Sequence, residues 1–96
     1  MEPFNILNNT HNQQFEVFVG EDRASLEYRM HDGIIVLMHT EVPEALGGKS
    51  IASALAEYAF QYASEHKLPV KVYCPFVATW LKRHPEKTAM LVPSEK

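Results

Sequence analysis

The sequence predicts an α/β fold with a mixed (α+β) sheet, in which an antiparallel meander precedes a parallel strand–helix–strand unit. Three observations support this fold class. Apolar and polar residues alternate over Ala24–Met30, while a continuous apolar run over Ile34–Met38 is typical of a strand buried on both faces. Over residues 50–66 the apolar period becomes that of a helix, and a short β-branched segment follows at Val70–Tyr73.

Turn signals separate the elements of the meander. Phe15–Val19 is expected to form the first strand, and the following Gly20-Glu21-Asp22 is a turn sequence. Asp32-Gly33 is a two-residue hairpin signal directly before the strand Ile34–Glu41. We therefore expect Ala24 to Glu41 to form an antiparallel hairpin.

The second half of the chain is expected to be a crossover unit. The helix over residues 50–66 carries an apolar stripe, made of Ile51, Leu55, Tyr58 and Tyr62. A second helix is predicted over residues 76–83, with Pro75 near its first turn. Because a helix connects them, Val70–Tyr73 should lie parallel to Ile34–Glu41. Residues 90–92 are a candidate edge strand.

Length and charge limit the classes of protein. With 96 residues and 46% hydrophobic content, the chain is expected to form one domain over residues 14–96, after a loosely held arm over residues 1–13 that is rich in Asn and Gln. A formal charge of −3 disfavours nucleic acid and anionic membranes as partners. No run approaches the roughly 20 apolar residues that span a bilayer, so we expect a cytoplasmic protein.

The cysteine and histidine content predicts no disulfide and no metal site. Cys74 is the only cysteine, which excludes an intramolecular disulfide. The five histidines lack the paired spacing of a zinc site. The fold is therefore expected to depend on its apolar core alone.

The join between the buried strand and the long helix is the candidate ligand site. Strand alternation places His39 and Glu41 on one face and Thr40 on the other. The glycines at positions 47 and 48 permit close backbone approach, and Ser50 is suited to cap the helix. Because helix N-termini bind anions, a phosphate-bearing ligand is the expected occupant.

Two interpretations of this loop compete. Gly48-Lys49-Ser50 matches the end of the nucleotide-binding P-loop, but position 43, where its first glycine belongs, is Pro43. The strand Val70–Tyr73 also has no Asp that could organise a magnesium ion. A meander before the loop further disfavours nucleoside-triphosphate chemistry, so we set this interpretation aside.

The second interpretation accounts for far more of the chain. The run HTEVPEALGGKSIASAL, followed by CPFV and then by RHP, resembles the small single-domain members of the GNAT superfamily of acyl-CoA-dependent N-acetyltransferases. The likeness spans roughly His11 to Val92, and its motifs are specific in combination. It implies a compact GNAT-like fold in which two parallel strands splay apart, acetyl-CoA enters the wedge, and its pyrophosphate lies on the helix N-terminus.

The loop departs from the superfamily pattern, which is Gln or Arg, two residues, Gly, one residue, then Gly or Ala. Those three places hold Gly47, Ser50 and Ala52. Ser50 narrows the gap for a phosphate, although its hydroxyl can donate a hydrogen bond, so coenzyme A should bind more weakly than in relatives with the full pattern. The resemblance assigns cofactor binding to Thr40, Val42, Gly47, Gly48, Lys49, Ser50, Ile51, Ala52, Cys74 and Phe76.

Three residues are candidates for catalysis. His39 and Glu41 can each accept a proton from an ammonium acceptor, whose amine must be neutral before it attacks. Alternatively, His39 is a hydrogen-bonded core residue and Glu41 caps a neighbouring loop. Cys74 follows the second parallel strand, and its thiolate would need a pKa lowered by His39 or by a helix N-terminus. Cys74 is otherwise an inert buried hydrophobe, because direct attack by an amine needs no protein nucleophile.

The predicted function is acetyl transfer from acetyl-CoA to an amine by direct attack in a ternary complex. A chain this short leaves little material for an acceptor pocket, so the amine belongs to a small molecule or to an exposed side chain of a protein. The alternative is a non-catalytic module that binds or senses acyl-CoA, and a plain interaction domain is the third class. The chain is expected to be a monomer or a weak dimer.

Overall fold

A computed structural model of the chain describes residues 4–47 and 49–92. Its sheet contains β1 (Leu7–Asn9), β2 (Gln14–Val19), β3 (Asp22–His31), β4 (Ile34–Glu41) and β5 (Val70–Val72). The helices are α1 (Lys49–Glu65) and α2 (Pro75–Lys82), and two 3₁₀ segments are η1 (Glu44–Leu46) and η2 (Pro85–Met90). In this part of the chain, no helix is long and apolar enough to cross a membrane.

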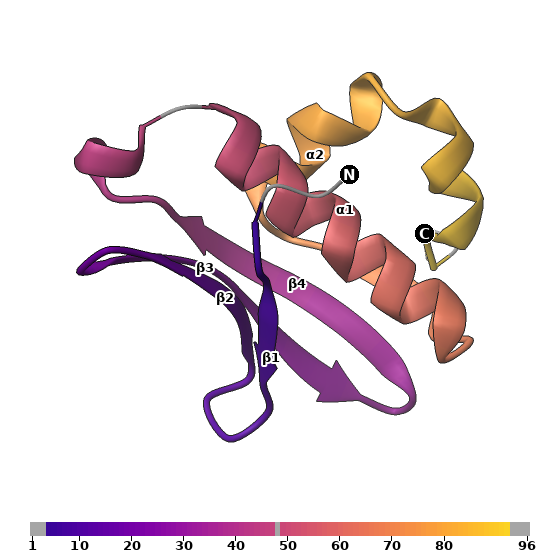
Figure 1. Ribbon diagram of the computed structural model, residues 1–96. Coiled ribbons are helices and arrows are strands. Elements are labelled where there is room, and N and C mark those ends of the chain that lie inside the picture. The colour runs from indigo at the N-terminus through magenta and orange to yellow at the C-terminus, as the bar shows by residue number, and fades with distance from the viewer. Residues whose placement is uncertain (1–3, 48, 93–96) are drawn as a thin grey trace.

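The predicted mixed sheet is confirmed. Its strands lie in sequence order from β1 to β5 (Figure 1), with antiparallel pairing as far as β4 and parallel pairing between β4 and β5. The β3–β4 hairpin closes at Asp32 and Gly33, whose φ angles are +55° and +76°. Asp and Gly tolerate this left-handed backbone, which is why the Asp-Gly signal located the turn.

The expected N-terminal arm needs one correction. Residues 7–9 form β1 at the edge of the sheet, where Leu7 lies opposite Glu16 and Asn9 opposite Gln14. Polar side chains hold this strand, because Asn9 donates to Glu16 (Nδ2 to Oε2, 3.2 Å) and Tyr28 donates to Asn8 (Oη to Oδ1, 2.6 Å). A strand held by amide side chains has no apolar period to reveal it.

The edge strand predicted at residues 90–92 is reduced to a single bridge beside β5. Pro85–Met90 is a 3₁₀ helix, stabilised by a hydrogen bond from the Thr88 hydroxyl to the Pro85 carbonyl (2.7 Å). Beyond it, Leu91 makes only an isolated parallel bridge to Val70. Pro85 favours the first turn of a helix, and this preference outweighs the preference of the three apolar residues 90–92 for a strand.

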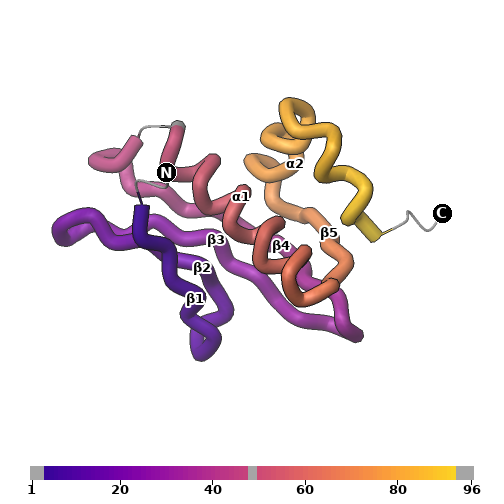
Figure 2. The backbone as a smooth tube through the Cα atoms, turned by 45° about the vertical axis from the view of Figure 1, so that its right-hand side comes forward, coloured from indigo at the N-terminus to yellow at the C-terminus, as the bar shows by residue number. Residues whose placement is uncertain are grey.

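Both helices pack on the same face of the sheet, as Figure 2 shows. The predicted stripe of α1 is confirmed, since Ile51 and Leu55 are buried while Glu57 on the opposite side is exposed. Phe60 of α1 and Trp80 of α2 stack with ring centroids 5.4 Å apart. This contact joins the two helices into one core with Phe15, Leu26, Ile35, Leu37 and Val77.

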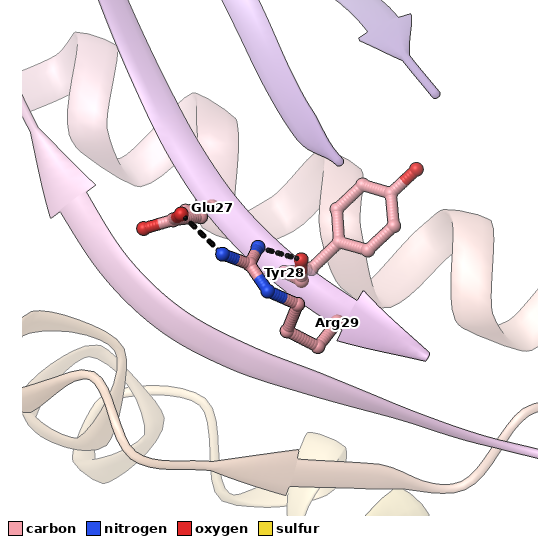
Figure 3. Close-up of polar contacts among 3 residues, drawn as sticks. All are labelled: Glu27, Tyr28 and Arg29. Carbon is pink, nitrogen blue, oxygen red and sulfur yellow. Dashed lines mark hydrogen bonds and ion pairs between the residues drawn. The ribbon is translucent and has the colours of Figure 1, made fainter. Parts of the chain in front are cut away.

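The other face of β3 is polar. Glu27 and Arg29 form an ion pair there (Oε2 to Nη2, 2.8 Å), while Tyr28 between them turns away (Figure 3). Tyr28 instead stacks on Phe15 under α1, with centroids 4.7 Å apart. We call the face that carries Glu27 and Arg29 the open face, because both described α-helices cover the opposite one.

A β-bulge changes the register of β4 near its end. Glu27 lies opposite His39, yet its neighbour Tyr28 lies opposite Leu37, so Met38 has no partner in β3. If Met38 stayed in the ladder and alternation continued from the buried Leu37, His39 would lie on the helix-covered face. The bulge reverses this and places His39 on the open face, opposite Glu27, and Thr40 on the helix-covered face, opposite Leu26.

Candidate functional site

The candidate site lies where β4 and β5 part. Pairing between these strands covers only Ile35–Leu37 and Val70–Val72, and then the amides of Tyr73 and Cys74 both donate to the Leu37 carbonyl (2.9 and 3.2 Å). β4 continues to Glu41 along β3, whereas the chain after β5 turns into α2. The two parallel strands therefore diverge beyond Leu37, in agreement with the splayed pair that the resemblance implies.

Thr40 and Cys74 face each other across this divergence. The Thr40 Oγ1 and Cys74 Sγ atoms lie 3.0 Å apart, and Cys74 is only 1% exposed. Cys74 is the N-cap residue of α2, and Pro75 follows it in the first turn. The predicted residues Thr40 and Cys74 are thus brought together, in a contact where either atom can be the hydrogen donor.

His39 and Glu41 lie on the opposite face of β4. Both are exposed, with Glu27 opposite His39 and Ser25 opposite Glu41 in β3. The alternative that His39 is a core residue is therefore wrong. Since Cys74 lies on the helix-covered side, the neighbours of its thiol are Thr40 and the start of α2 rather than His39.

The loop between β4 and α1 is closed by a tight turn at Gly47. Its amide donates to the Glu44 carbonyl (3.0 Å), and a Cβ atom at Gly47 would lie 2.9 Å from that same oxygen. Real Cβ atoms do not approach backbone oxygens this closely without a shift. The superfamily's Gln or Arg at this place would require the turn to shift, so glycine is the residue that suits the loop's geometry.

The start of α1 holds the other predicted binding residues. Ser50 lies inside the first turn, because the helix begins at Lys49, so the expectation that Ser50 caps the helix is wrong. Gly48 and the Lys49 side chain, which were also predicted to bind the cofactor, lie outside the described residues. Ile51 and Ala52 point into the core, at 4% and 8% exposure, and only their backbone is left to contact a ligand.

Two shallow hollows flank the first turns of α1. One, of about 230 Å³, is lined by Phe4, Val19, Ala45, Leu46, Ser50 and Ile51. The other, of about 210 Å³, is lined by Ser53, Phe76, Thr79, Trp80, Arg83 and His84. Of the second set only Phe76 was predicted, since helical spacing alone does not reveal that residues of α2 face the start of α1. Val42 is half-buried against the core.

Comparisons with known proteins agree with this geometry. A family model described as GCN5-related N-acetyl-transferase matches residues 14–90. Protein NATD1 of Mus musculus is 33% identical over 86 residues, covering 86% of this chain and 78% of the relative, and NATD1 of Homo sapiens is 33% identical with 86% and 76% covered. The solution structure of a GCN5-like protein from Staphylococcus aureus matches with a TM-score of 0.72 at 23% identity, covering 99% of this chain and 94% of that one, which supports the fold alone.

Proposed function

The chain belongs to the GCN5-related N-acetyltransferase family, and we propose from this premise that it transfers an acetyl group from acetyl-CoA to an amine. The observation that carries the proposal is the divergence of β4 and β5 beside the N-terminus of α1. A divergent strand pair next to free helix amides is a place where an extended chain ending in a diphosphate fits.

The residues at the start of α1 fit the diphosphate of such a donor. The first amides of a helix have no intrahelical partner and carry the positive end of its dipole. Ser50 is exposed at this end, so its hydroxyl is available to a phosphate oxygen. The pantetheine arm would then follow β4 past Val42, toward the Thr40–Cys74 contact at the inner end of the divergence.

The chemistry is nucleophilic substitution at a thioester. When bound, acetyl-CoA supplies the acetyl group, which an amine takes as a new amide bond while the coenzyme leaves as a thiol. The amine arrives as an ammonium ion and must lose a proton first. His39 is exposed on the open face, and histidine is the side chain that most often serves as a general base; Glu41 on the same face is the second candidate.

The bulge supplies a means to polarise the thioester carbonyl. A residue that leaves the β-ladder frees backbone groups for other partners. Met38 is the bulged residue, and it lies between His39 and Leu37, the last residue of β4 that pairs with β5. We assign the polarising backbone N–H to this segment, where a fixed dipole stabilises the developing oxyanion.

The open face is the proposed acceptor side. The donor contacts proposed above lie on the helix-covered side of β4, whereas His39 and Glu41 lie on the other side. An amine can thus approach without displacing the donor. Because His39 and Glu41 are both exposed on this face, we propose an accessible amine, such as that of a protein side chain, as the acceptor.

A second function is supported by a specific observation. Gly47 lacks the side chain with which the superfamily's Gln or Arg would contact the cofactor, and Ser50 replaces its glycine. A domain with this weakened loop is suited to respond to the concentration of acyl-CoA without turning it over. The sensing module is therefore the alternative to be tested.

Calorimetry and a turnover assay separate these functions. Titration with acetyl-CoA and with coenzyme A should release heat for both the enzyme and the sensor, and an absence of heat with either ligand would refute both. Release of the coenzyme thiol with a panel of amines then identifies the enzyme. Binding without turnover of any amine would favour the sensor.

His39→Ala tests the proposed base. Turnover should fall by about a hundredfold, the lower end of what general-base catalysis contributes, while the affinity for coenzyme A stays unchanged. His31→Ala is the matched control, because His31 is also an exposed histidine, at the far end of β3. Equal turnover in the two variants would assign the proton transfer to another group.

A further inference from the structure

The second hollow beside α1, which Ser53 and Trp80 help to line, has aromatic and charged residues to which the proposed function assigns no role. We infer that it seats the purine of coenzyme A and that Arg83 binds the ribose 3′-phosphate, so that the protein distinguishes coenzyme A from its dephospho form. This inference rests on the proposed function, because it concerns the other end of the same donor.

The size and lining of the hollow suit one aromatic ring system. Its volume of about 210 Å³ lies below the roughly 300–1,000 Å³ of sites that enclose a drug-sized ligand. Phe76, Trp80 and His84 contribute three aromatic rings to its wall. Flat heteroaromatic bases stack favourably on such side chains.

His84 gives this wall an accessible ring. The rings of Phe60, Trp80 and His84 form a stacked column that runs outward from the core, with centroids 5.4 and 4.2 Å apart. Trp80 covers one side of the imidazole, yet the His84 side chain is still 38% exposed. A purine can therefore extend the column at its outer end without opening the core.

The hollow lies about one helical turn along α1 from the proposed phosphate site. Ser53 lines it, and Ser50 is three residues earlier on α1. At 1.5 Å per residue, this spacing is about 4.5 Å along the helix axis. A nucleotide whose diphosphate rests on the first amides of α1 thus has its base within reach of the hollow.

Charge distinguishes this hollow from the one on the other flank of α1. That one is lined by a single aromatic residue, Phe4, and has no charged residue in its wall. Arg83 lines the second hollow, and an arginine guanidinium can bind a phosphate through two parallel hydrogen bonds. Within residues 4–47 and 49–92, no carboxylate forms an ion pair with Arg83.

Arg83 also has a structural interpretation that the experiment must separate. It is the C-cap residue of α2, where a positive charge is favourable next to the helix dipole. Its backbone amide donates to the Trp80 and Leu81 carbonyls, and substitution of the side chain leaves this amide in place. Lys82 carries the same charge in the same turn but does not line the hollow, which makes Lys82→Ala a matched control.

Calorimetry with coenzyme A and with dephospho-coenzyme A tests the role of Arg83. The wild-type protein should bind coenzyme A about tenfold more tightly, as expected for one charge-assisted phosphate contact at a partly exposed site. Arg83→Ala should bind both ligands equally, at the wild-type affinity for the dephospho form. Lys82→Ala should keep the difference, whereas a helix-dipole role would make both variants lose stability without changing the ratio.

Nuclear magnetic resonance tests the location of the purine. Trp80 is the only tryptophan, so its indole N–H gives one assigned signal. Adenosine 3′,5′-bisphosphate, which lacks the pantetheine arm and the thioester, should shift this signal and that of Ser53. This inference would be overturned if coenzyme A bound with heat but the Trp80 signal did not shift and the protein bound coenzyme A no more tightly than dephospho-coenzyme A. The proposed function would then still stand. An absence of heat with coenzyme A would overturn both.

Discussion

Replacing Gly47 by alanine should destabilise the protein, although alanine fits the backbone angles at this position. Gly47 has φ −63° and ψ 10°, which every L-residue adopts easily. At such a position a Gly→Ala change ordinarily stabilises a protein by about 0.4–1 kcal/mol, because the unfolded chain loses freedom. Here the new Cβ would lie 2.9 Å from the Glu44 carbonyl oxygen, a backbone atom that cannot rotate away.

The size of the effect follows from these opposing contributions. Forcing an extra carbon into a closed contact costs about 1–3 kcal/mol. Because the turn lies at the surface and can shift, we expect the lower half of this range and a net loss of about 1 kcal/mol. For a domain of this size, that corresponds to a melting temperature lower by about 4–8 °C.

Thermal unfolding followed by circular dichroism measures this change, and calorimetry with coenzyme A shows whether the shifted turn also weakens binding. Gly33 is the comparison, since it has φ +76° and nothing within 4 Å of a Cβ. Gly33→Asn should be nearly neutral because Asn tolerates positive φ, whereas Gly47→Asn should be as harmful as alanine. A higher melting temperature for Gly47→Ala would refute the tight turn.

Two further predictions concern buried groups. Cys74→Ala should keep turnover within a few-fold, because direct attack needs no thiol, and a loss of orders of magnitude in the thiol-release assay would indicate an acyl-enzyme. Burial, and secondarily the charge of Tyr62, raise the pKa of Tyr28 above its ordinary value of 10.0, although the hydrogen bond to Asn8 opposes this. Above pH 10 the unfolded chain therefore releases this proton before the folded protein does, so stability should fall as the pH rises. Urea unfolding between pH 8 and 11 should show a shallower fall for Tyr28→Phe, and identical slopes would contradict the assignment.

The architecture could be predicted from local signals because each of its main elements has one. The Asp32-Gly33 turn, the apolar run of β4 and the stripe of α1 all lie where their patterns indicate. The elements that were not predicted have no regular apolar period in their sequence. Residues 7–9 pair through amide side chains, and the 3₁₀ helix of residues 85–90 takes up Met90, the first residue of the edge strand predicted at 90–92.

The site could be predicted only in part, for a different reason. The resemblance correctly indicated a divergent strand pair and placed Thr40 and Cys74 near it. Their contact and the exposure of His39 depend on the bulge at Met38, which no local pattern of β4 reveals. Arg83 and His84 were outside the predicted set because their proximity to α1 arises from packing between two helices. The expectation of a monomer or weak dimer stays a prediction.

The bulge at Met38 decides which face each later side chain of β4 occupies. If Met38 paired with Glu27 in a regular ladder, every later residue would shift by one place, so that His39 and Glu41 would face the helices and Thr40 would face solvent. Deleting Met38, in contrast, would close the bulge and leave the later residues on the faces they now occupy. A single-residue gap at this point in an alignment of related chains is therefore compatible with the same arrangement of side chains on the two faces, whereas an added or lost residue on either side of the bulge is not.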